Sequence, residues 1–183
     1  MKFLYSISVA ILAALTFNTG YAEQMCNDSV EVTTPSSRFE INDDQAFDTK
    51  TGLVWKRCLE GQNWNTELSQ CDGNAISVNW KGALQSVSEG WRLPNIKELG
   101  SIVEHSCGNP SINLNVFPIE AISPTLWSST PNRLYLGQVD NRRAWATLFQ
   151  DGVSRNVFKS DSRLSVLLVK DAVILEPIEE LPQ

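Results

Sequence analysis

Histidine, the side chain that enzymes most often use for acid–base catalysis, is scarce in this chain. The 183 residues include a single histidine, His105, near the predicted end of a helix. One histidine cannot supply the two or three imidazoles of common iron and zinc centres, and no GxSxG motif offers a nucleophile for it to activate. A favourable cation at a helix C-terminus is the simpler role for His105. The sequence therefore predicts a non-catalytic protein without a cofactor.

Four cysteines could form disulfides or bind a metal ion. There is no CxxC pair, and the spacings of 32, 13 and 36 residues do not match a zinc ribbon, so disulfides are favoured. Three connectivities are possible. We favour Cys58–Cys71, because it closes a compact loop, and Cys26–Cys107, because it ties the N-terminal segment to the end of a predicted helix. Disulfides persist in oxidising compartments.

Residues suited to ligand recognition gather in two segments. The first is the polar stretch between Cys58 and Cys71, where an exposed Trp64 could stack on a sugar while amides and carboxylates bind its hydroxyl groups. The second is residues 131–143, a predicted loop whose three arginines suit a sulfated or carboxylated glycan. The alternatives are core packing for the indole and an ordinary solvated connection for the loop. The candidate ligand-binding residues are Trp64, Asn132, Arg133, Tyr135, Asn141, Arg142 and Arg143.

A calcium site would need six to eight oxygen ligands, with several carboxylates converging. The pairs Asp43-Asp44 and Asp140-Asn141 could contribute, but the chain has neither the Glu-Pro-Asn nor the Trp-Asn-Asp sequence that calcium-dependent lectins use. We therefore expect no obligatory calcium site and no other metal site.

The charge and the N-terminal residues limit the partners and the compartment. A net charge of −6 argues against nucleic acid as a partner. Residues 1–22 combine a basic start, an apolar run and small residues at Gly20 and Ala22, which predicts a signal peptide cut after Ala22. The apolar run is too short to span a bilayer, so we expect no transmembrane anchor after cleavage. The mature chain is predicted to be secreted or periplasmic.

Hydrophobic periodicity predicts the elements that carry these residues. Short alternations at residues 38–41, 46–48 and 53–56 indicate an antiparallel meander. Apolar positions 80, 83, 84 and 87 predict a helix that stops at Gly90. A second helix should begin at Asn95, with Glu98 completing a capping box, and end near Cys107-Gly108.

The C-terminal half reads as strands. Residues 126–129 and 144–149 are predicted strands, and the latter should form a hairpin with residues 153–158 through Asp151-Gly152. Residues 164–169 are apolar almost throughout, which predicts a central strand buried on both faces. Residues 23–37 form a lead-in segment held by Cys26. Residues 171–183 form an acidic tail, whose inner part, residues 172–175, could add an edge strand.

An ordered set of motifs runs through the middle of the chain. The motifs are residues 48–58 (DTKTGLVWKRC), Gly61, Trp64, residues 71–73 (CDG), Trp80 with Ala83 and Leu84, residues 90–99 (GWRLPNIKEL), Phe117-Pro118, residues 127–130 (WSST) and residues 149–152 (FQDG). Together they resemble the Lcl C-terminal domain family, a bacterial extracellular domain of unknown function that also ends a collagen-like adhesin. The resemblance covers residues 38–170.

This resemblance implies an α+β, C-type-lectin-like fold, in which antiparallel sheets carry two helices and a long loop region, here stabilised by disulfides. Residues 91–94 (WRLP) also resemble a strand-to-helix turn of formylglycine-generating enzymes. That activity requires a reactive cysteine site, whereas the cysteines here are assigned to disulfides, so the activity is not carried over.

These features predict an exported, adhesin-like binding module that recognises a surface glycan, matrix or an envelope protein partner. The alternative is a structural or accessory subunit of an envelope or surface assembly that has no soluble ligand.

Overall fold

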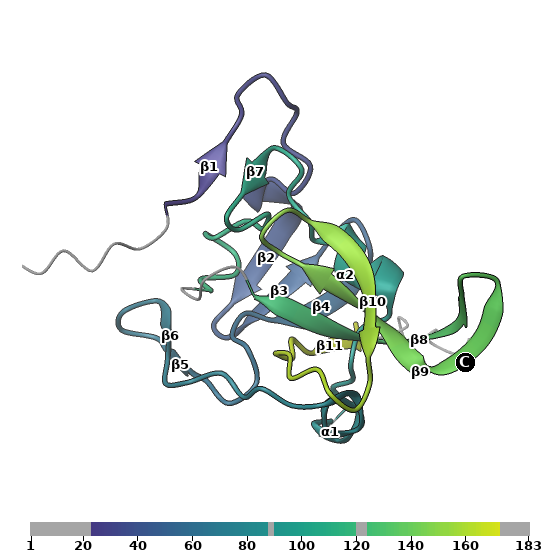
Figure 1. Ribbon diagram of the computed structural model, residues 1–183. Coiled ribbons are helices and arrows are strands. Elements are labelled where there is room, and N and C mark those ends of the chain that lie inside the picture. Colours follow the sequence, from purple (N-terminus) through teal and green to yellow (C-terminus); the bar gives the residue numbers. More distant parts are fainter. Residues whose placement is uncertain (1–22, 88–89, 120–123, 173–183) are drawn as a thin grey trace, which may run out of the picture.

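The computed structural model describes residues 23–87, 90–119 and 124–172, which form antiparallel sheets and two short helices (Figure 1). The predicted antiparallel α+β architecture is therefore confirmed at this level. The predicted signal peptide, residues 1–22, and residues 173–183 of the predicted tail lie outside the described residues. Among the described residues, no helix is long and apolar enough to cross a membrane.

The first sheet contains the predicted meander. Its order is β11-β4-β3-β2, and the meander consists of β2 (Phe39–Asn42), β3 (Gln45–Asp48) and β4 (Leu53–Lys56). Asp43 and Gly52 occupy the turns with φ of 53° and 71°, a region that Asp and Gly tolerate better than most residues. Side chains alternate between faces, so the cross-strand partners Ala46 and Trp55 point together into the core, where both are fully buried.

The second sheet has the order β10-β9-β8, formed by β8 (Thr125–Tyr135), β9 (Gln138–Leu148) and β10 (Val153–Phe158). The predicted hairpin of residues 144–149 with 153–158 is confirmed, and Gly152 adopts φ 72° at its turn. The prediction of a loop at residues 131–143 is wrong. Strands β8 and β9 continue through this segment to Leu136-Gly137, because cross-strand pairing extends to Tyr135 and Gln138.

The apolar run at residues 164–169 lies between the two sheets instead of at the centre of one. The Leu168 carbonyl accepts a hydrogen bond from Lys56 N in β4, and the Ser165 carbonyl accepts one from Trp127 N in β8. Only Val169 belongs to a ladder strand, the edge strand β11 (Val169–Asp171). The run is nevertheless buried on both sides. Leu167 and Val169 join the core cluster around Trp55, whereas Val166 and Leu168 join the cluster around Trp127.

Both helices are shorter than predicted. Helix α1 (Trp80–Gln85) buries Ala83 but leaves Leu84 exposed, and Val87 lies exposed beyond the end of the helix, so the predicted apolar stripe packs only in part. Helix α2 (Ile96–Ser101) begins with the predicted capping box of Asn95 and Glu98.

The predicted end of the second helix is wrong. Helix α2 ends at Ser101, whose hydroxyl donates to the Glu98 carbonyl at 2.7 Å and competes with the helical pattern. His105 therefore lies exposed beyond the helix, so its predicted role as a cation at the helix C-terminus is also wrong.

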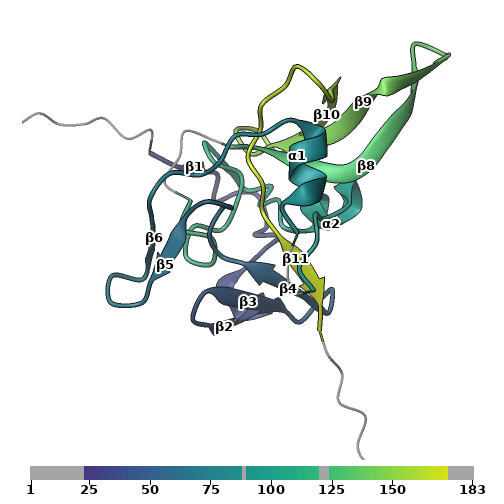
Figure 2. The ribbon, with the colours of Figure 1, turned by 90° about the horizontal axis from the view of Figure 1, so that it is seen from below.

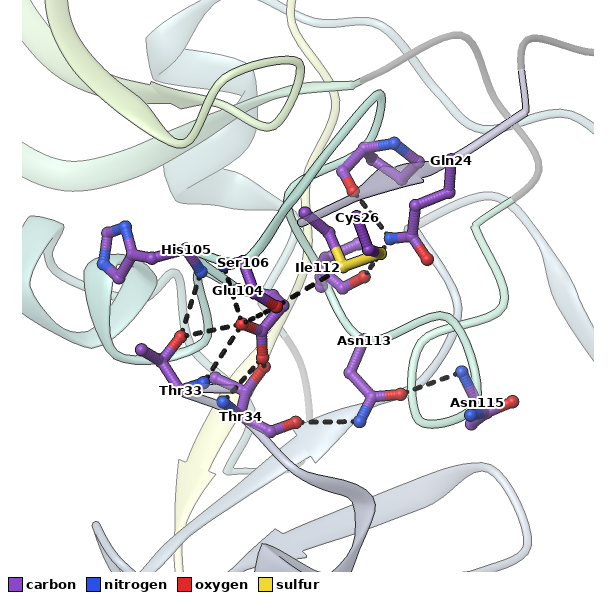
Figure 3. The surroundings of a disulfide bond; sticks show 12 residues. Gln24, Cys26, Thr33, Thr34, Glu104, His105, Ser106, Ile112, Asn113 and Asn115 are labelled. Atoms are coloured by element: carbon purple, nitrogen blue, oxygen red, sulfur yellow. Dashed lines mark hydrogen bonds between the residues drawn. A yellow bond between two sulfur atoms is a disulfide. The ribbon is translucent and has the colours of Figure 1, made fainter. Parts of the chain in front are cut away.

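The lead-in segment is attached to the region after α2 by a short ladder, a disulfide and a buried carboxylate (Figure 3). Strand β1 (Met25–Cys26) pairs with β7 (Cys107–Gly108), and Cys26 and Cys107 form a disulfide. The Glu104 carboxylate accepts hydrogen bonds from the backbone amides of Thr33, Thr34 and Ser106 at 2.7–3.0 Å, and from their hydroxyls. A one-turn 3₁₀ helix, η1 (Ser36–Arg38), then leads into β2.

Candidate functional site

A small hairpin closed by a disulfide carries the first candidate residue, Trp64. Strands β5 (Asn63–Asn65) and β6 (Gln70–Asp72) pair antiparallel, with Trp64 opposite Cys71. Cys71 forms a disulfide with Cys58, so the structure contains both disulfides in the pairing favoured from the sequence. The disulfide restricts the base of this hairpin and thereby positions Trp64 relative to the core.

The indole of Trp64 is half-buried and held on two sides. Its Nε1–H donates to Asp43 Oδ1 at 2.8 Å, and the Arg57 guanidinium carbon lies 4.0 Å from the ring centroid. Arg57 is itself buried and donates to the backbone carbonyls of Val116 and Asp43. Burial lowers the pKa of Arg57, although the nearby carboxylates of Asp43 and Asp44 act in the opposite direction. The cation–π contact and the hydrogen bond fix the ring plane before any ligand arrives.

A cleft of about 230 Å³ opens beside this indole. Its lining combines an aromatic ring with carboxylates, amides and an amine. The lining residues are Asp44, Lys56, Cys58, Leu59, Glu60, Gly61, Gln62, Asn63 and Trp64. Carboxylates accept hydrogen bonds, and side-chain amides both donate and accept them, so the cleft can bind a ligand that is rich in hydroxyl groups.

Gly61 allows the wall of the cleft to approach the neighbouring backbone. Its φ is 91°, and a Cβ atom there would lie 2.7 Å from Ile76 Cγ2 and 2.9 Å from the Asn74 carbonyl oxygen. Both the backbone conformation and the close approach therefore require glycine.

The second set of candidate residues lies on the β8–β9 hairpin, and much of it is already engaged within the hairpin. Arg142 pairs with Asp140 at 3.1 Å, and Arg143 lies 3.5 Å from the same carboxylate. Arg143 also stacks on Phe158, with 3.9 Å between the guanidinium carbon and the ring centroid. Hydrogen bonds from Arg142 hold the pKa of Asp140 below its usual range. This carboxylate therefore remains ionised, and its negative charge partly neutralises the charges of Arg142 and Arg143.

The remaining residues of this set differ in exposure. Asn132 is buried, whereas Arg133 and Asn141 are exposed. The Asn141 carbonyl accepts a hydrogen bond from Lys159 Nζ at 2.8 Å. The side chain of Tyr135 lies outside the described part of the structure. An accessible recognition surface here would therefore consist mainly of Arg133, Asn141 and Arg142.

The two candidate segments lie on different sides of the molecule. In both ribbon views, β5 and β6 stand at one side of the fold and the distal parts of β8 and β9 at the other (Figures 1 and 2). Trp64 and residues 131–143 do not form one surface, so they are separate candidate sites.

The other tryptophans pack inside the fold or at its margin. Trp55 and Trp127 are fully buried and Trp91 nearly so, while Trp80 and Trp145 are half-buried. The Nε1–H groups of Trp80 and Trp127 donate to the backbone carbonyls of Ser128 and Val78 at 2.8 Å. These contacts support the core-packing interpretation for these rings.

Several residues of the cleft were not predicted from the sequence. Glu60, Gln62 and Asn63 line the cleft but belong to no recognisable motif. Their only signal was their polar character in the loop that contains Trp64. In the described ranges there is no group of three or more His, Cys, Asp or Glu residues that could hold a metal ion.

The two disulfides and the α+β sheets define a small domain consistent with extracellular or periplasmic proteins. The Lcl C-terminal domain family matches residues 44–170, and the chain belongs to this family. The resemblance recognised in the sequence motifs is thus confirmed. No match to the chain was found among curated proteins. Family membership indicates an extracellular domain of unknown function.

Proposed function

We propose that this protein is an exported, non-catalytic binding module that recognises carbohydrate in the cleft beside Trp64. The observation that supports this most directly is the combination of a fixed indole with two carboxylates and two amides around a cleft of about 230 Å³. The predicted signal peptide and the two disulfides support an extracellular or periplasmic location.

Each part of the cleft suits one property of a sugar. The C–H face of a pyranose ring is apolar and packs against an indole, whereas its hydroxyl groups need hydrogen-bond partners at the edge. Trp64 offers the apolar surface, and Glu60 and Asn63 line the same cleft. Because Trp64 Nε1 is already bonded to Asp43, the indole would contact a sugar through its carbon atoms.

We also infer that the domain has a C-type-lectin-like fold, as the family resemblance implies. The described sheets, the two short helices and the disulfide-closed loop at Cys58–Cys71 support this inference. In this arrangement the β5–β6 hairpin belongs to the long loop region that the family pattern predicts.

A glycan array with the purified exported protein tests the proposal. We expect binding without cleavage of the glycan, and we expect Glu60→Gln and Asn63→Ala each to weaken binding about tenfold, the effect of losing one good hydrogen bond. Trp64→Ala should abolish measurable binding. Far-ultraviolet circular dichroism of each variant checks that the fold is retained.

The matched control is Arg133→Ala combined with Arg142→Ala and Arg143→Ala. If the Trp64 cleft is the site, this triple variant keeps its glycan affinity. If only the triple variant loses binding, together with the salt dependence of its retention on heparin-like beads, then the arginine-bearing hairpin is the site and the Trp64 proposal is wrong. Absence of glycan binding together with co-purification of one fixed protein would favour the accessory-subunit alternative.

A further inference from the structure

The end of the β8–β9 hairpin projects from the body as a two-stranded ribbon. Strand β10 pairs with β9 only as far as Arg143, whose partner on β8 is Asn132. Beyond this point residues 133–135 and 138–142 form a two-stranded ribbon, in which Leu134 pairs with Val139 and Tyr135 with Gln138, and within the described residues no third strand pairs with it. Both ribbon views show this part extending beyond the other elements (Figures 1 and 2). At ~3.3 Å per residue, the five β9 residues 138–142 form an arm roughly 15 Å long.

This arm ends in exposed apolar side chains. Leu134, Leu136 and Val139 are 62%, 86% and 77% exposed. Leu134 and Val139 are direct cross-strand partners, so their side chains share one face of the ribbon, and Leu136 lies in the turn beyond them. Isolated exposed aliphatic residues are common, but three together at the end of a projecting element indicate a contact surface.

The geometry of the turn at the end of the arm does not explain why position 136 is a leucine. Leu136 and Gly137 have φ of 51° and 78°, and a two-residue turn of this kind is normally occupied by Asn-Gly or Asp-Gly. Leucine is disfavoured at positive φ and gains nothing from packing at this exposure. Neither local folding nor the core therefore explains an apolar side chain at this position.

The charges around the apolar residues are positive. Residues 131–143 contain three arginines and one acid, in a chain whose net charge is −6. The acid, Asp140, is 8% exposed and faces Arg142 and Arg143, while Arg142 and Arg133 are exposed. The tip thus presents aliphatic groups with exposed guanidinium groups next to them and no exposed carboxylate within residues 131–143.

We propose that this hairpin tip docks onto an anionic phospholipid surface. Leu134, Leu136 and Val139 enter the boundary between headgroups and acyl chains, and Arg133 and Arg142 contact lipid phosphates. A narrow convex tip needs a matching groove on a protein, whereas a bilayer deforms around it. The arm is longer than the Debye length of about 8 Å at physiological salt, so the acidic body is largely screened from the lipid charge.

Co-sedimentation with vesicles tests this proposal. The full exported protein should bind vesicles of phosphatidylcholine mixed with phosphatidylglycerol, and bind pure phosphatidylcholine much more weakly. Leu136→Asp should reduce binding to the mixed vesicles at least about tenfold, since it replaces an inserting aliphatic group by a like charge. Arg133→Ala should reduce both the affinity and its dependence on salt.

The matched control is Leu68→Asp, which changes an exposed leucine (64%, against 62% for Leu134 and 86% for Leu136) on the β5–β6 hairpin. It should leave vesicle binding unchanged. Failure of the unmodified protein to bind mixed vesicles, or equal loss with Leu68→Asp, would overturn the proposal. Self-association without lipid that Leu136→Asp abolishes would instead identify the tip as a contact between copies. Because the vesicles carry no glycan, the outcome is independent of the Trp64 cleft.

Discussion

A buried ion pair connects the end of η1 to the end of β3. Arg38 and Asp48 form a bidentate contact, and their side chains are only 8% and 0% exposed. Burial alone would raise the pKa of Asp48, but hydrogen bonds from Arg38, Thr51 and the Lys50 amide hold it below its ordinary value. Asp48 therefore remains charged, and each partner offsets part of the cost of burying the other.

Removing one partner should be strongly destabilising. We expect Asp48→Asn to lower the free energy of unfolding by about 3 kcal/mol, because it leaves the buried Arg38 without a counter-charge. Chemical denaturation followed by tryptophan fluorescence measures this change. The control is Arg155→Met, which breaks an exposed pair with Asp151 and should cost no more than about 0.5 kcal/mol. Equal effects of the two substitutions would show that burial does not control this interaction.

Among the elements, the loop from Cys58 to Cys71 links the fold most directly to the candidate ligand site. Its disulfide and the β5–β6 ladder determine where Trp64 lies, and Gly61 allows the loop to pass close to Ile76. The loop geometry is thus set by backbone constraints more than by apolar packing.

Gly61→Ala should therefore disturb both stability and binding. The alanine Cβ would overlap Ile76 and the Asn74 carbonyl, and it would hold a positive φ, so we expect a loss of about 1–3 kcal/mol. Thermal unfolding and glycan titration report the two effects. Gly100→Ala is the control. Gly100 lies inside α2, where an added Cβ atom would meet nothing within 4 Å beyond the helix's own backbone. Because alanine favours the helix more than glycine does, this substitution should raise the free energy of unfolding by up to about 1 kcal/mol.

At the scale of the whole molecule, the Glu104 carboxylate is one of the contacts that join the lead-in segment to the rest of the fold, together with the β1–β7 ladder and the Cys26–Cys107 disulfide. Burial alone would raise the pKa of Glu104, but hydrogen bonds from Ser106, Thr33 and Thr34 lower it to about 2. Its ordinary value is 4.5, so the unfolded chain takes up a proton at higher pH than the folded chain does. The stability that Glu104 contributes is present above pH 4.5 and is lost as the pH falls toward 2.

Acid unfolding measures this contribution. We expect Glu104→Gln to lower the free energy of unfolding by about 3 kcal/mol near neutral pH, and the difference from the unmodified protein to shrink between pH 4.5 and 2. Denaturant titrations across this range give the two curves. A difference that stays constant with pH would contradict the assignment of the effect to the ionised Glu104.

Local patterns predicted much of the fold correctly. The alternation at residues 38–56, the Asp151-Gly152 hairpin and the Asn95–Glu98 capping box depend on interactions between residues close in sequence. The disulfide pairing was also favoured from the sequence, because cysteine spacing limits the choices to three. Trp64 was a candidate site residue because an indole in a polar, disulfide-closed loop is unusual.

The remaining features depend on partners far apart in the chain. Helix α2 stops at Ser101, and the region after it is tied to Thr33 and Thr34 through Glu104, about 70 residues away. The run at residues 164–169 divides its side chains between two core clusters, which periodicity alone cannot distinguish from a central strand.

The sequence by itself determined the family and the short-range strands and caps, because each depends on motif order or on nearby residues, and it limited the disulfide pairings to three, of which one was favoured. Only the tertiary structure decided that Asp43 and Arg57 hold Trp64 and that residues 131–143 form a projecting hairpin away from it. Those relations follow from long-range packing of β4, the β5–β6 hairpin and the second sheet, which no local pattern encodes.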